Sequence, residues 1–576
     1  MLPHKQIELK LQAAVRVVLP DADVSAVLVR PCPDPKFGDY QSNALMSLAK
    51  QRKSNPRQLA TDTLAKLDVS EVCEKVEVAG AGFLNFRLKP SVLSQTLEAA
   101  ARGEHLFFEK TTVPKTAVID FSSPNVAKPM HVGHIRSTIL GDSLARTLRL
   151  LGHRVITDNH IGDWGTQFGL IILGIKRARR FSKSNSFFIP EDLENLYKGM
   201  VEDSRKKPDI LDSARNELVK LQNGDPENLN IWEMLIQISK DSFDHIYFRL
   251  GVKFDHTLGE SFYNDRLKPL VDELLAKGIA RESEGAIAIF FEDNPQLKEH
   301  PALIRKSDGG FNYTTTDLAT LAYRLETWKP DEIIYVTDGR QQLHFQQLFA
   351  AFRKWHGESK TKLAHVWFGS ILGEDGKPFK TRSGETVKLA DLLDEAEERA
   401  FKIVSEKSAE LSEAQRKEIA RVVGLGAVKY ADLLPNRQSD YVFSWDKMLA
   451  LQGNTAPYLQ YAYARIKSIF RKAEGTFNAQ HSTFNIQLAE AEEIALAKHL
   501  LNFGLTLEAV AEEYRPNFLC NFLFELAGKF TSFYENCPVL KAEEAVRGSR
   551  LALCDLTARV LKQGHDVLGI EVVEQM

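Results

Sequence analysis

The stretch DFSSPNVAKPMHVGH, from Asp120 to His134, decides how the middle of this chain folds. The apolar residues Thr116–Ile119 before it have the composition of a short buried strand. The residues Ile135–Leu151 after it have the apolar spacing of an amphipathic helix. A strand that passes directly into a helix is typical of a parallel sheet built from βαβ units.

The turn itself carries groups that suit phosphate. Backbone N–H groups at the start of a helix are unpaired and carry partial positive charge, and Gly133 allows a ligand to approach the backbone closely. His131 and His134 lie three residues apart, so they share one helix face and can donate hydrogen bonds to phosphate oxygens. The alternatives are a buried structural pair or metal ligands, but His-x-x-His without a third ligand is a poor zinc site. The turn therefore predicts a nucleotide site.

Length, composition and net charge limit the class of protein to which this chain can belong. A chain of 576 residues is expected to hold about three or four domains, and 44% apolar with 26% charged residues is ordinary for a soluble globular protein. The net charge of −3 does not by itself indicate a polyanionic partner, so a nucleic-acid site would need local basic patches.

The five cysteines are widely scattered and contain no Cys-x-x-Cys pair, which excludes zinc knuckles and suits a reducing compartment. No apolar run reaches membrane-spanning length, and the N-terminus lacks the apolar centre of a secretory signal. A cytoplasmic protein is the simplest interpretation.

The pattern along the chain predicts four regions. Residues 1–110 indicate a small α+β module, and residues 111–390 an α/β parallel-sheet domain with a helical insertion at about 181–250. Residues 391–450 indicate a helical connection, and residues 451–576 an all-α bundle. The strands expected in the parallel sheet are Ala117–Phe121, Arg154–Asp158, Ala286–Phe291, Glu332–Asp338 and His365–Ile371.

Together with further blocks, residues 120–134 resemble the arginyl-tRNA synthetase family among the class I aminoacyl-tRNA synthetases, whose HIGH motif sits at the first strand–helix turn of a Rossmann-like domain. The further blocks lie in family order at 159–169, 259–263, 311–317, 338–344 and 453–461. The match covers nearly the whole chain.

This resemblance implies an ATP-dependent ligase that joins L-arginine to its tRNA. Arginyl-adenylate would form first, and the arginyl group would then pass to the 2′-OH of the terminal adenosine. Mg²⁺ would accompany ATP with no protein-bound metal, tRNA would bind before arginine is activated, and the chain would be a monomer. Two alternatives stay open: a non-catalytic tRNA-binding relative, and a small-molecule nucleotidyltransferase.

The resemblance also implies which residues contact ATP. The loop GKPFKTRSG, at 376–384, corresponds to the family's lysine-rich KMSKS loop, but Thr381 stands about where the second lysine is expected. Lys128 is thought to supply the missing charge. The catalytic residues implied are therefore Lys128, His131, His134, Lys377 and Lys380, and the ATP contacts are Ser123, His131, Gly133, His134, Asp338, His344 and Lys380.

A pocket selective for arginine needs carboxylates and planar acceptors, because the guanidinium group is a planar fork of donors. Tyr313 and Asp317 are four residues apart, which places them on one side of a predicted helix. The resemblance implies that the arginine site consists of Asp120, Asn125, Tyr313, Asp317 and Gln341.

RNA recognition favours unstacked bases lying on aromatic faces. By resemblance the anticodon-loop site consists of Tyr458, Tyr461, Tyr534 and the C-terminal Met576, although aromatic residues at helical spacing also pack bundle cores. The N-terminal module is expected to meet the tRNA elbow, with Phe37, Tyr40, Asn85 and Arg87 as candidates.

Overall fold

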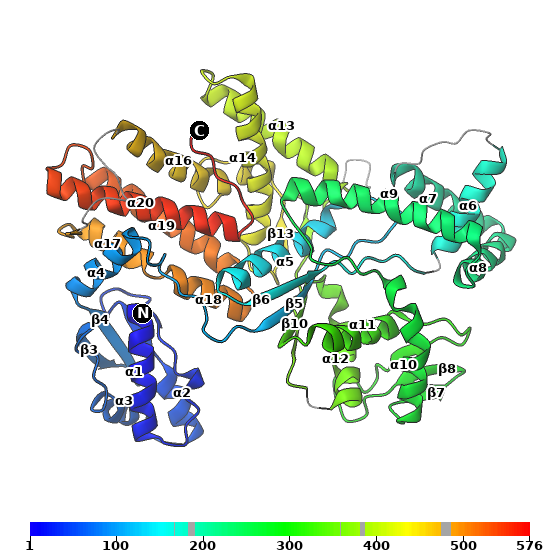
Figure 1. The fold of residues 1–576 in the computed structure, drawn as a ribbon, viewed down its shortest axis with the longest axis horizontal. Coiled ribbons are helices and arrows are strands. Elements are labelled where there is room, and N and C mark those ends of the chain that lie inside the picture. The colour runs from blue at the N-terminus through cyan, green and yellow to red at the C-terminus, as the bar shows by residue number, and fades with distance from the viewer. Residues whose placement is uncertain (166, 182–189, 358, 381–385, 474–484) are drawn as a thin grey trace. The chain divides into compact units, whose positions relative to one another are not determined.

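The computed structural model describes residues 1–165, 167–181, 190–357, 359–380, 386–473 and 485–576 (Figure 1). The chain forms two compact units. The central unit consists of Thr112–Leu449 and Val567–Ile570. The terminal unit consists of Met1–Thr111, Ala450–Asp566 and Glu571–Met576, and therefore contains both ends of the chain.

A four-stranded parallel sheet is the framework of the central unit, and Figure 1 shows three of its strands side by side. The strands, in the order β11-β10-β5-β6, are Lys362–His365, Glu332–Tyr335, Thr116–Asp120 and Arg154–Asp158. Asp120, Tyr335 and Asp158 pair in register, so the carboxyl ends of three strands meet at one edge. Ligands of open α/β sheets bind at this edge. The predicted Rossmann-like parallel sheet is confirmed.

Helices connect and cover these strands. They are α5 (Val132–Leu150), α11 (Tyr313–Trp328) and α12 (Gln342–His356). Val118 of β5, Ile333 of β10 and Leu318 of α11 belong to one buried apolar core. Burial of these side chains fixes the sheet edge against the helices that begin there.

One predicted strand belongs to a different sheet. β8 (Ala286–Ile289) lies between β7 (Ala280–Ser283) and β9 (Ala302–Arg305) in an antiparallel three-stranded sheet, so its assignment to the parallel sheet was wrong. The two-residue turn before β8 explains the difference, because Glu284 and Gly285 both have positive φ, at 52° and 76°. That geometry is a hairpin turn. The strand expected over 365–371 is also displaced, since β11 ends at His365 and β12 covers only Ile371–Leu372.

Helices fill the region between β6 and the antiparallel sheet. They are α6 (Gln167–Phe181), α7 (Pro190–Lys206), α8 (Pro208–Gln222), α9 (Pro226–Leu250), η2 (Glu260–Tyr263) and α10 (Asn264–Ala276). Proline at the first position of α8 and α9 suits a helix start, since its fixed φ is helical and it lacks the N–H that would be unpaired there.

The last part of the central unit follows the sheet. It contains α13 (Leu389–Lys407), α14 (Glu413–Leu433) and α15 (Trp445–Met448). The short helix η3 (Gly339–Gln341) lies earlier, between β10 and α12. The short strand β13 (Tyr441–Val442) pairs in parallel with β12.

The N-terminal part of the terminal unit is α+β. Its antiparallel sheet has the order β1-β2-β4-β3, with strands Arg30–Pro31, Tyr40–Ser42, Phe83–Leu88 and Cys73–Ala79. Its helices are α1 (Pro3–Val18), η1 (Val24–Ala26), α2 (Ala44–Gln51), α3 (Pro56–Leu64) and α4 (Pro90–Ala101).

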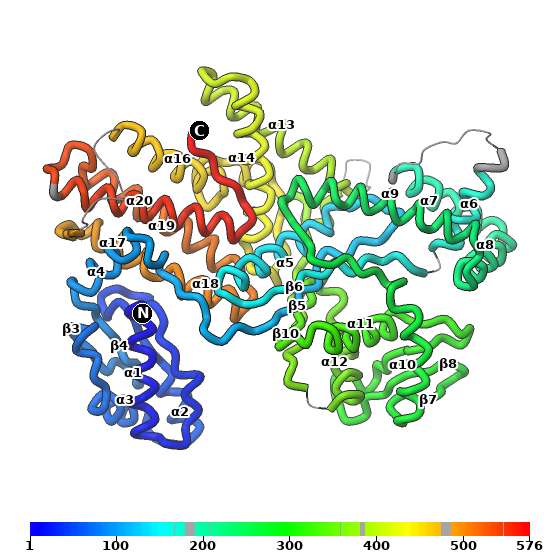
Figure 2. Tube along the Cα trace, in the orientation of Figure 1, coloured from blue at the N-terminus to red at the C-terminus, as the bar shows by residue number. Residues whose placement is uncertain are grey.

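The C-terminal part is a helical bundle. It consists of α16 (Ala456–Lys472), α17 (Ala491–Leu500), α18 (Phe503–Glu513), α19 (Asn517–Asn536) and α20 (Glu544–Val567). The chain trace in Figure 2 shows α17 and α18 as separate helices, and both pack on α19. An 18-residue window within Ala491–Glu513 has a mean hydropathy of 1.2, high enough for a membrane span by length and composition, but 56% of that window is buried inside the structure. A core helix of a soluble protein passes the same test.

Candidate active site

The turn between β5 and α5 is strained and held by side chains. Ser122, Ser123 and Ala127 have φ of 71°, 47° and 61°, a region that costs a non-glycine residue about 1 kcal/mol or more. Backbone N–H groups of this turn donate to side chains at three places: Ser122 to Ser137 Oγ (2.8 Å), Ser123 to Asn159 Oδ1 (3.0 Å) and Ala127 to Ser239 Oγ (2.9 Å). Local sequence does not favour this conformation, so the surrounding structure imposes it.

His131 and His134 cap the start of α5. His131 Nδ1 accepts from the N–H of Gly133 (3.1 Å), and His134 Nδ1 accepts from the N–H of His131 (3.1 Å). Since each Nδ1 is an acceptor, the proton of each neutral ring lies on Nε2. Burial lowers the pKa of both imidazoles, that of His134 to about 3. The turn thus presents two neutral Nε2–H donors rather than two cations.

The chain that leaves the lysine loop is hydrogen-bonded to the start of α5. The N–H of Val132 donates to Val387 O (2.9 Å), and the N–H of Leu389 donates to Met130 O (2.9 Å). The chain that leaves the loop therefore runs beside the two histidines.

Arg136 of α5 binds the chain that enters the lysine loop. Its buried guanidinium lies 3.0 Å from Asp432 and donates to Gly369 O (2.7 Å), just before β12. Rings of Phe368 and Tyr441 flank it at 5.6 and 5.1 Å. The first two turns of α5 thus fix both ends of the lysine loop relative to the histidines.

The loop's lysines are accessible. Lys377 and Lys380 are exposed, and the turn before them is closed by Asp375, whose Oδ1 accepts from the N–H of Lys377 (3.0 Å). Lys128 is half-buried, with its ammonium 5.1 Å from the ring of Tyr197. Thr381 and the rest of the motif to residue 384 lie outside the described residues.

Below the sheet edge lies a buried charge cluster. Arg324 Nη2 donates to Asp120 Oδ2 (2.6 Å) and to Asp158 Oδ2 (2.8 Å), and all three side chains are buried. The other oxygen of Asp120 accepts from Ser123 Oγ (3.0 Å). Both oxygens of Asp120 are thus engaged within the chain itself.

Hydrogen-bond acceptors gather beside this cluster. Asp317 Oδ2 accepts from His344 Nε2 (2.6 Å), and Oδ1 lies 4.0 Å from His160 Nε2. His160 Nδ1 lies 3.0 Å from the carbonyl of Leu258, which can only accept. A neutral His160 therefore presents Nε2 as an acceptor, and this buried atom has no hydrogen-bond partner among the described residues.

The charge of Asp317 persists in this buried place. Burial acts to raise the pKa of Asp317, but the hydrogen bond and the charge of His344, with the charge of Arg324, outweigh it and hold the pKa below its usual value. An anionic carboxylate with an open oxygen is a strong partner for a cationic ligand.

Glu260 is a site residue to which sequence reasoning gave no role. The pKa of its carboxyl is raised to about 7, chiefly by burial and also by the charges of Asp317 and Asp163. The block 259–263 was recognised in the sequence, but nothing local shows that η2 brings its acid to Asp317. A perturbed acid beside two others is typical of a binding or catalytic site.

The other predicted site residues are distributed as follows. Tyr313 is 58% exposed and its ring meets that of His344 edge-on at 4.8 Å. Asn125 is exposed in the turn and pairs with Gly162, and Gln341 is exposed before α12. Asp338 caps η3 and accepts from Arg340 at 2.8 Å. The structure thus brings Tyr313, Asp317 and His344 together.

Among the described residues, no group of three or more His, Cys, Asp or Glu side chains is arranged to hold a metal ion.

Three family models match the chain. Residues 96–445 match "tRNA synthetases class I (R), catalytic domain", residues 5–88 match "Arginyl tRNA synthetase N terminal domain", and residues 459–576 match "DALR anticodon binding domain". The chain belongs to the class I arginyl-tRNA synthetase family. The resemblance in the sequence is therefore confirmed, as are the N-terminal module and the C-terminal helical domain.

Curated relatives in this family extend over the whole chain. The arginine–tRNA ligase of Chromobacterium violaceum is 46% identical over 582 residues, covering 100% of both chains. That of Haemophilus ducreyi is 48% identical over 554 residues, covering 95% of this chain and 98% of the relative.

Solved structures of family members share the fold. The arginyl-tRNA synthetase of Plasmodium falciparum superposes with a TM-score of 0.84 at 31% identity, covering 100% of this chain and 99% of that one. The synthetase of Thermus thermophilus gives 0.83 at 26% identity, covering 100% of both chains.

The family's anticodon-binding region carries the four predicted RNA contacts or adjoins them. Tyr461 on α16 is 44% exposed, whereas Tyr458, just before the matched region, packs against Phe524 at 5.8 Å. Tyr534 on α19 lies under the guanidinium of Arg465 at 4.8 Å, and Met576 is half-buried. Tyr461 therefore offers the most accessible ring for an RNA base.

Proposed function

We propose that this chain ligates L-arginine to its tRNA at the expense of ATP, through arginyl-adenylate. The observation that carries the proposal is that one unit presents both a set of acceptors, formed by Asp317, Glu260 and His160 Nε2, and the Nε2–H donors at the start of α5. The acceptors suit a guanidinium fork and the donors suit phosphate.

Selectivity would arise from charge and shape together. Asp317 and Glu260 supply two carboxylates and His160 a third acceptor, so several guanidinium N–H groups find partners at once. An ammonium group is a compact point charge and leaves part of this set unpaired, which costs free energy in a buried site.

Within the same site, Tyr313 would close the pocket through its contact with His344, and the exposed Asn125 and Gln341 would bind the α-amino and carboxylate groups of arginine. Asp120 would not contact arginine directly but would support the site, since it holds Arg324 and Ser123 in place. Arg324 in turn supports the sheet edge on which the amino acid rests.

Activation forms a bond between an arginine carboxylate oxygen and the α-phosphorus of ATP and breaks the bond to pyrophosphate. His131 and His134 would donate Nε2–H to phosphate oxygens, and the N–H groups near Gly133 would add to them. Lys128, Lys377 and Lys380 would neutralise the pyrophosphate that leaves. Ser123, Asp338 and His344 would complete the ATP site, and Mg²⁺ would enter with ATP.

Transfer then moves the arginyl group to the 2′-OH of the terminal adenosine. The carboxylate oxygen that joined phosphorus leaves with AMP, so the ester forms without further ATP. The tRNA would also be bound by Tyr458, Tyr461, Tyr534 and Met576 of the terminal unit. We expect arginine activation to require bound tRNA, which ATP–pyrophosphate exchange with and without tRNA tests directly.

The protein would act as a monomer in the cytoplasm. Size-exclusion chromatography with light scattering tests the first statement, and a mass near 64.9 kDa is expected. Cell fractionation tests the second.

Aminoacylation of total tRNA with each of the twenty amino acids tests the whole proposal. Arginine alone should be charged, in an ATP-dependent reaction. Charging of another amino acid, or of none with every reactant present, would contradict it.

A further inference from the structure

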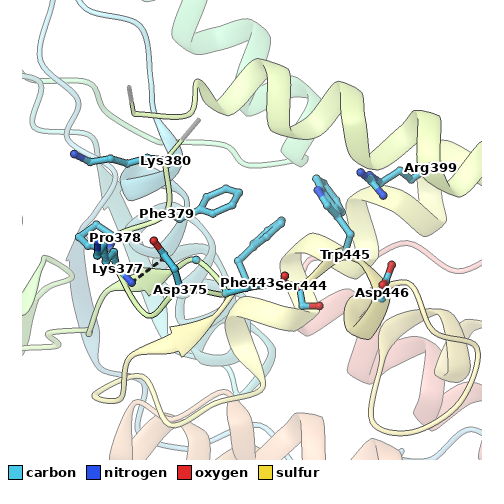
Figure 3. A pocket seen from close by; sticks show the side chains of 12 residues that line it. Asp375, Lys377, Pro378, Phe379, Lys380, Arg399, Phe443, Ser444, Trp445 and Asp446 are labelled. Atoms are coloured by element: carbon cyan, nitrogen blue, oxygen red, sulfur yellow. Dashed lines mark hydrogen bonds between the residues drawn. The ribbon is translucent and has the colours of Figure 1, made fainter. Parts of the chain in front are cut away.

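A second cavity of about 700 Å³ lies in the central unit, behind the lysine loop. Its walls come from the loop at 373–380, from α13, and from the chain at 443–446 (Figure 3). Neither the two histidines of α5 nor any of the arginine acceptors lines it. Of the site described above, the cavity therefore shares only the loop residues Lys377 and Lys380.

Aromatic rings form the middle of the cavity. Phe379 of the loop stacks on Phe443 with centroids 4.5 Å apart, and Phe443 meets Trp445 edge-on at 4.9 Å. Phe443 is buried, whereas Phe379 and Trp445 are only half-buried and leave ring surface open to the cavity. Half-exposed rings in a concave wall accept a flat π-system of almost any identity.

Cationic side chains lie at both ends of the cavity, as Figure 3 shows. Lys377 and Lys380 lie at one end, and Arg399 lies over the Trp445 ring at 5.2 Å at the other. Arg399 is fixed by Glu395, which accepts from its Nε and Nη2 at 2.8 and 2.7 Å. A guanidinium held on an indole leaves its remaining N–H groups available for a phosphate oxygen.

Acids also line the cavity, and they decide how much negative charge it tolerates. Asp375 is engaged in closing the loop turn, and Glu374 and Asp446 are exposed. Three carboxylates against three cations give a lining with no net charge. Such a lining disfavours a free triphosphate, whereas a nucleotide within an RNA strand brings one phosphate, a base and hydroxyl and amino donors that carboxylates accept.

We propose that this cavity binds one unpaired nucleotide of the tRNA substrate, with its base on Trp445 and its phosphate at Arg399. The cavity lies within the range of about 300–1,000 Å³ that encloses small ligands. The proposal rests on the proposed function, because it takes tRNA as the substrate. A nucleotide held there touches the loop that presents Lys377 and Lys380. Bound RNA therefore directly contacts the loop whose lysines meet ATP.

The first test replaces the stacking ring. Trp445→Leu keeps apolar bulk and removes the π-face, and Trp445→Phe keeps a π-face. The dissociation constant of tRNA, measured by filter binding, should rise about tenfold for Trp445→Leu and stay within about twofold for Trp445→Phe. The KM for arginine at saturating tRNA should not change.

The second test replaces the cation and has a matched control on the same helix. Arg399→Ala should weaken tRNA binding and reduce its salt slope by about one. Lys402→Ala removes an equal charge from α13, where Lys402 pairs with Glu398 outside the cavity, and should do neither. Melting temperatures of all variants show whether each is folded.

Three results would overturn the proposal. An unchanged tRNA dissociation constant for a folded Trp445→Leu variant would remove the base site. Equal losses for Arg399→Ala and Lys402→Ala would reduce the effect to general electrostatics. A raised KM for ATP with unchanged tRNA binding would assign the cavity to ATP. Failure of wild-type protein to charge arginine at all would instead contradict the proposed function, so the two failures are distinguishable.

Discussion

Arg136 and Asp432 form an ion pair at 3.0 Å in which the side chains are 1% and 0% exposed. Arg136 belongs to α5 and Asp432 to α14, and the same guanidinium donates to Gly369 O at the entry to the lysine loop. The pair is therefore a buried junction between the helix that presents the histidines and the segment that presents the lysines.

Asp432→Asn tests this junction. The variant leaves the Arg136 cation without its carboxylate in a buried place, which should cost about 3–5 kcal/mol in the free energy of unfolding of the central unit. The midpoint of urea unfolding, followed by fluorescence, measures the change. Glu418→Gln on the same helix breaks a solvent-exposed pair with Arg421 and should cost less than about 1 kcal/mol. Equal losses in the free energy of unfolding for the two variants would show that the buried pair stabilises the unit no more than an exposed pair does.

Asp317→Ala tests the guanidinium partner. Removing a carboxylate from a buried charged contact typically costs about 2–5 kcal/mol, which predicts a rise in the KM for arginine of at least about thirtyfold. The KM for ATP should change little, and the protein should remain folded. Glu326→Ala, on the exposed face of α11 where Glu326 pairs with Arg266, serves as the control. An unchanged KM for arginine would remove Asp317 from the pocket.

Glu260 predicts a pH dependence. Its pKa is raised to about 7, so its carboxyl is neutral below pH 7 and anionic above. The value of kcat/KM for arginine should therefore fall as the pH drops from 8 to 6, since one of the two carboxylates loses its charge. Glu260→Gln should lower kcat/KM throughout and flatten this part of the profile. A profile with the same slope in wild type and variant would exclude Glu260 as its source.

The same raised pKa has a consequence for stability. A carboxyl whose pKa is about 7 when folded and 4.5 when unfolded holds its proton more tightly in the folded state. Its contribution to stability is therefore fully present below pH 4.5 and is lost as the pH rises through 7. Bound arginine should reverse this trend by stabilising the anion.

His131→Ala tests the phosphate donors. The variant removes one neutral Nε2–H donor and the cap of α5, so the rate of ATP–pyrophosphate exchange should fall about 100-fold or more. Because burial lowers the pKa of the His131 imidazole, the ring should act as a neutral donor at pH 8, where exchange is measured. A loss of less than about threefold would show that the histidine does not meet the reacting phosphate.

The sequence predicted what local patterns determine. The strand, turn and helix from Thr116 to Leu150 follow from apolar periodicity. The apolar spacing likewise predicts a helix over Ala456–Lys472, and α16 has these bounds. The sequence did not show which sheet contains β8, because a short apolar run has the same pattern in a parallel sheet and in a hairpin. The apolar spacing over Leu488–Glu513 predicts one helix, whereas the structure has two, α17 and α18, whose break at 501–502 has no proline or glycine to mark it.

The site shows the same division. His131 and His134 are neighbours in sequence, so their common face was predictable. Glu260 reaches Asp317 only through the tertiary fold, and nothing around Asp120 indicates that Arg324, 204 residues away, engages its carboxylate. The positive φ of Ser122 likewise results from long-range hydrogen bonds, including one from Thr138 Oγ1 to Ser122 Oγ at 2.8 Å.

The most direct measurement of the central claim compares arginine with lysine and citrulline in ATP–pyrophosphate exchange with tRNA present. Citrulline has nearly the shape of arginine without its charge, and lysine has the charge without the fork. If Asp317, Glu260 and His160 read the guanidinium, kcat/KM should favour arginine over each by at least about 1,000-fold. Comparable values for either analogue would contradict the claim.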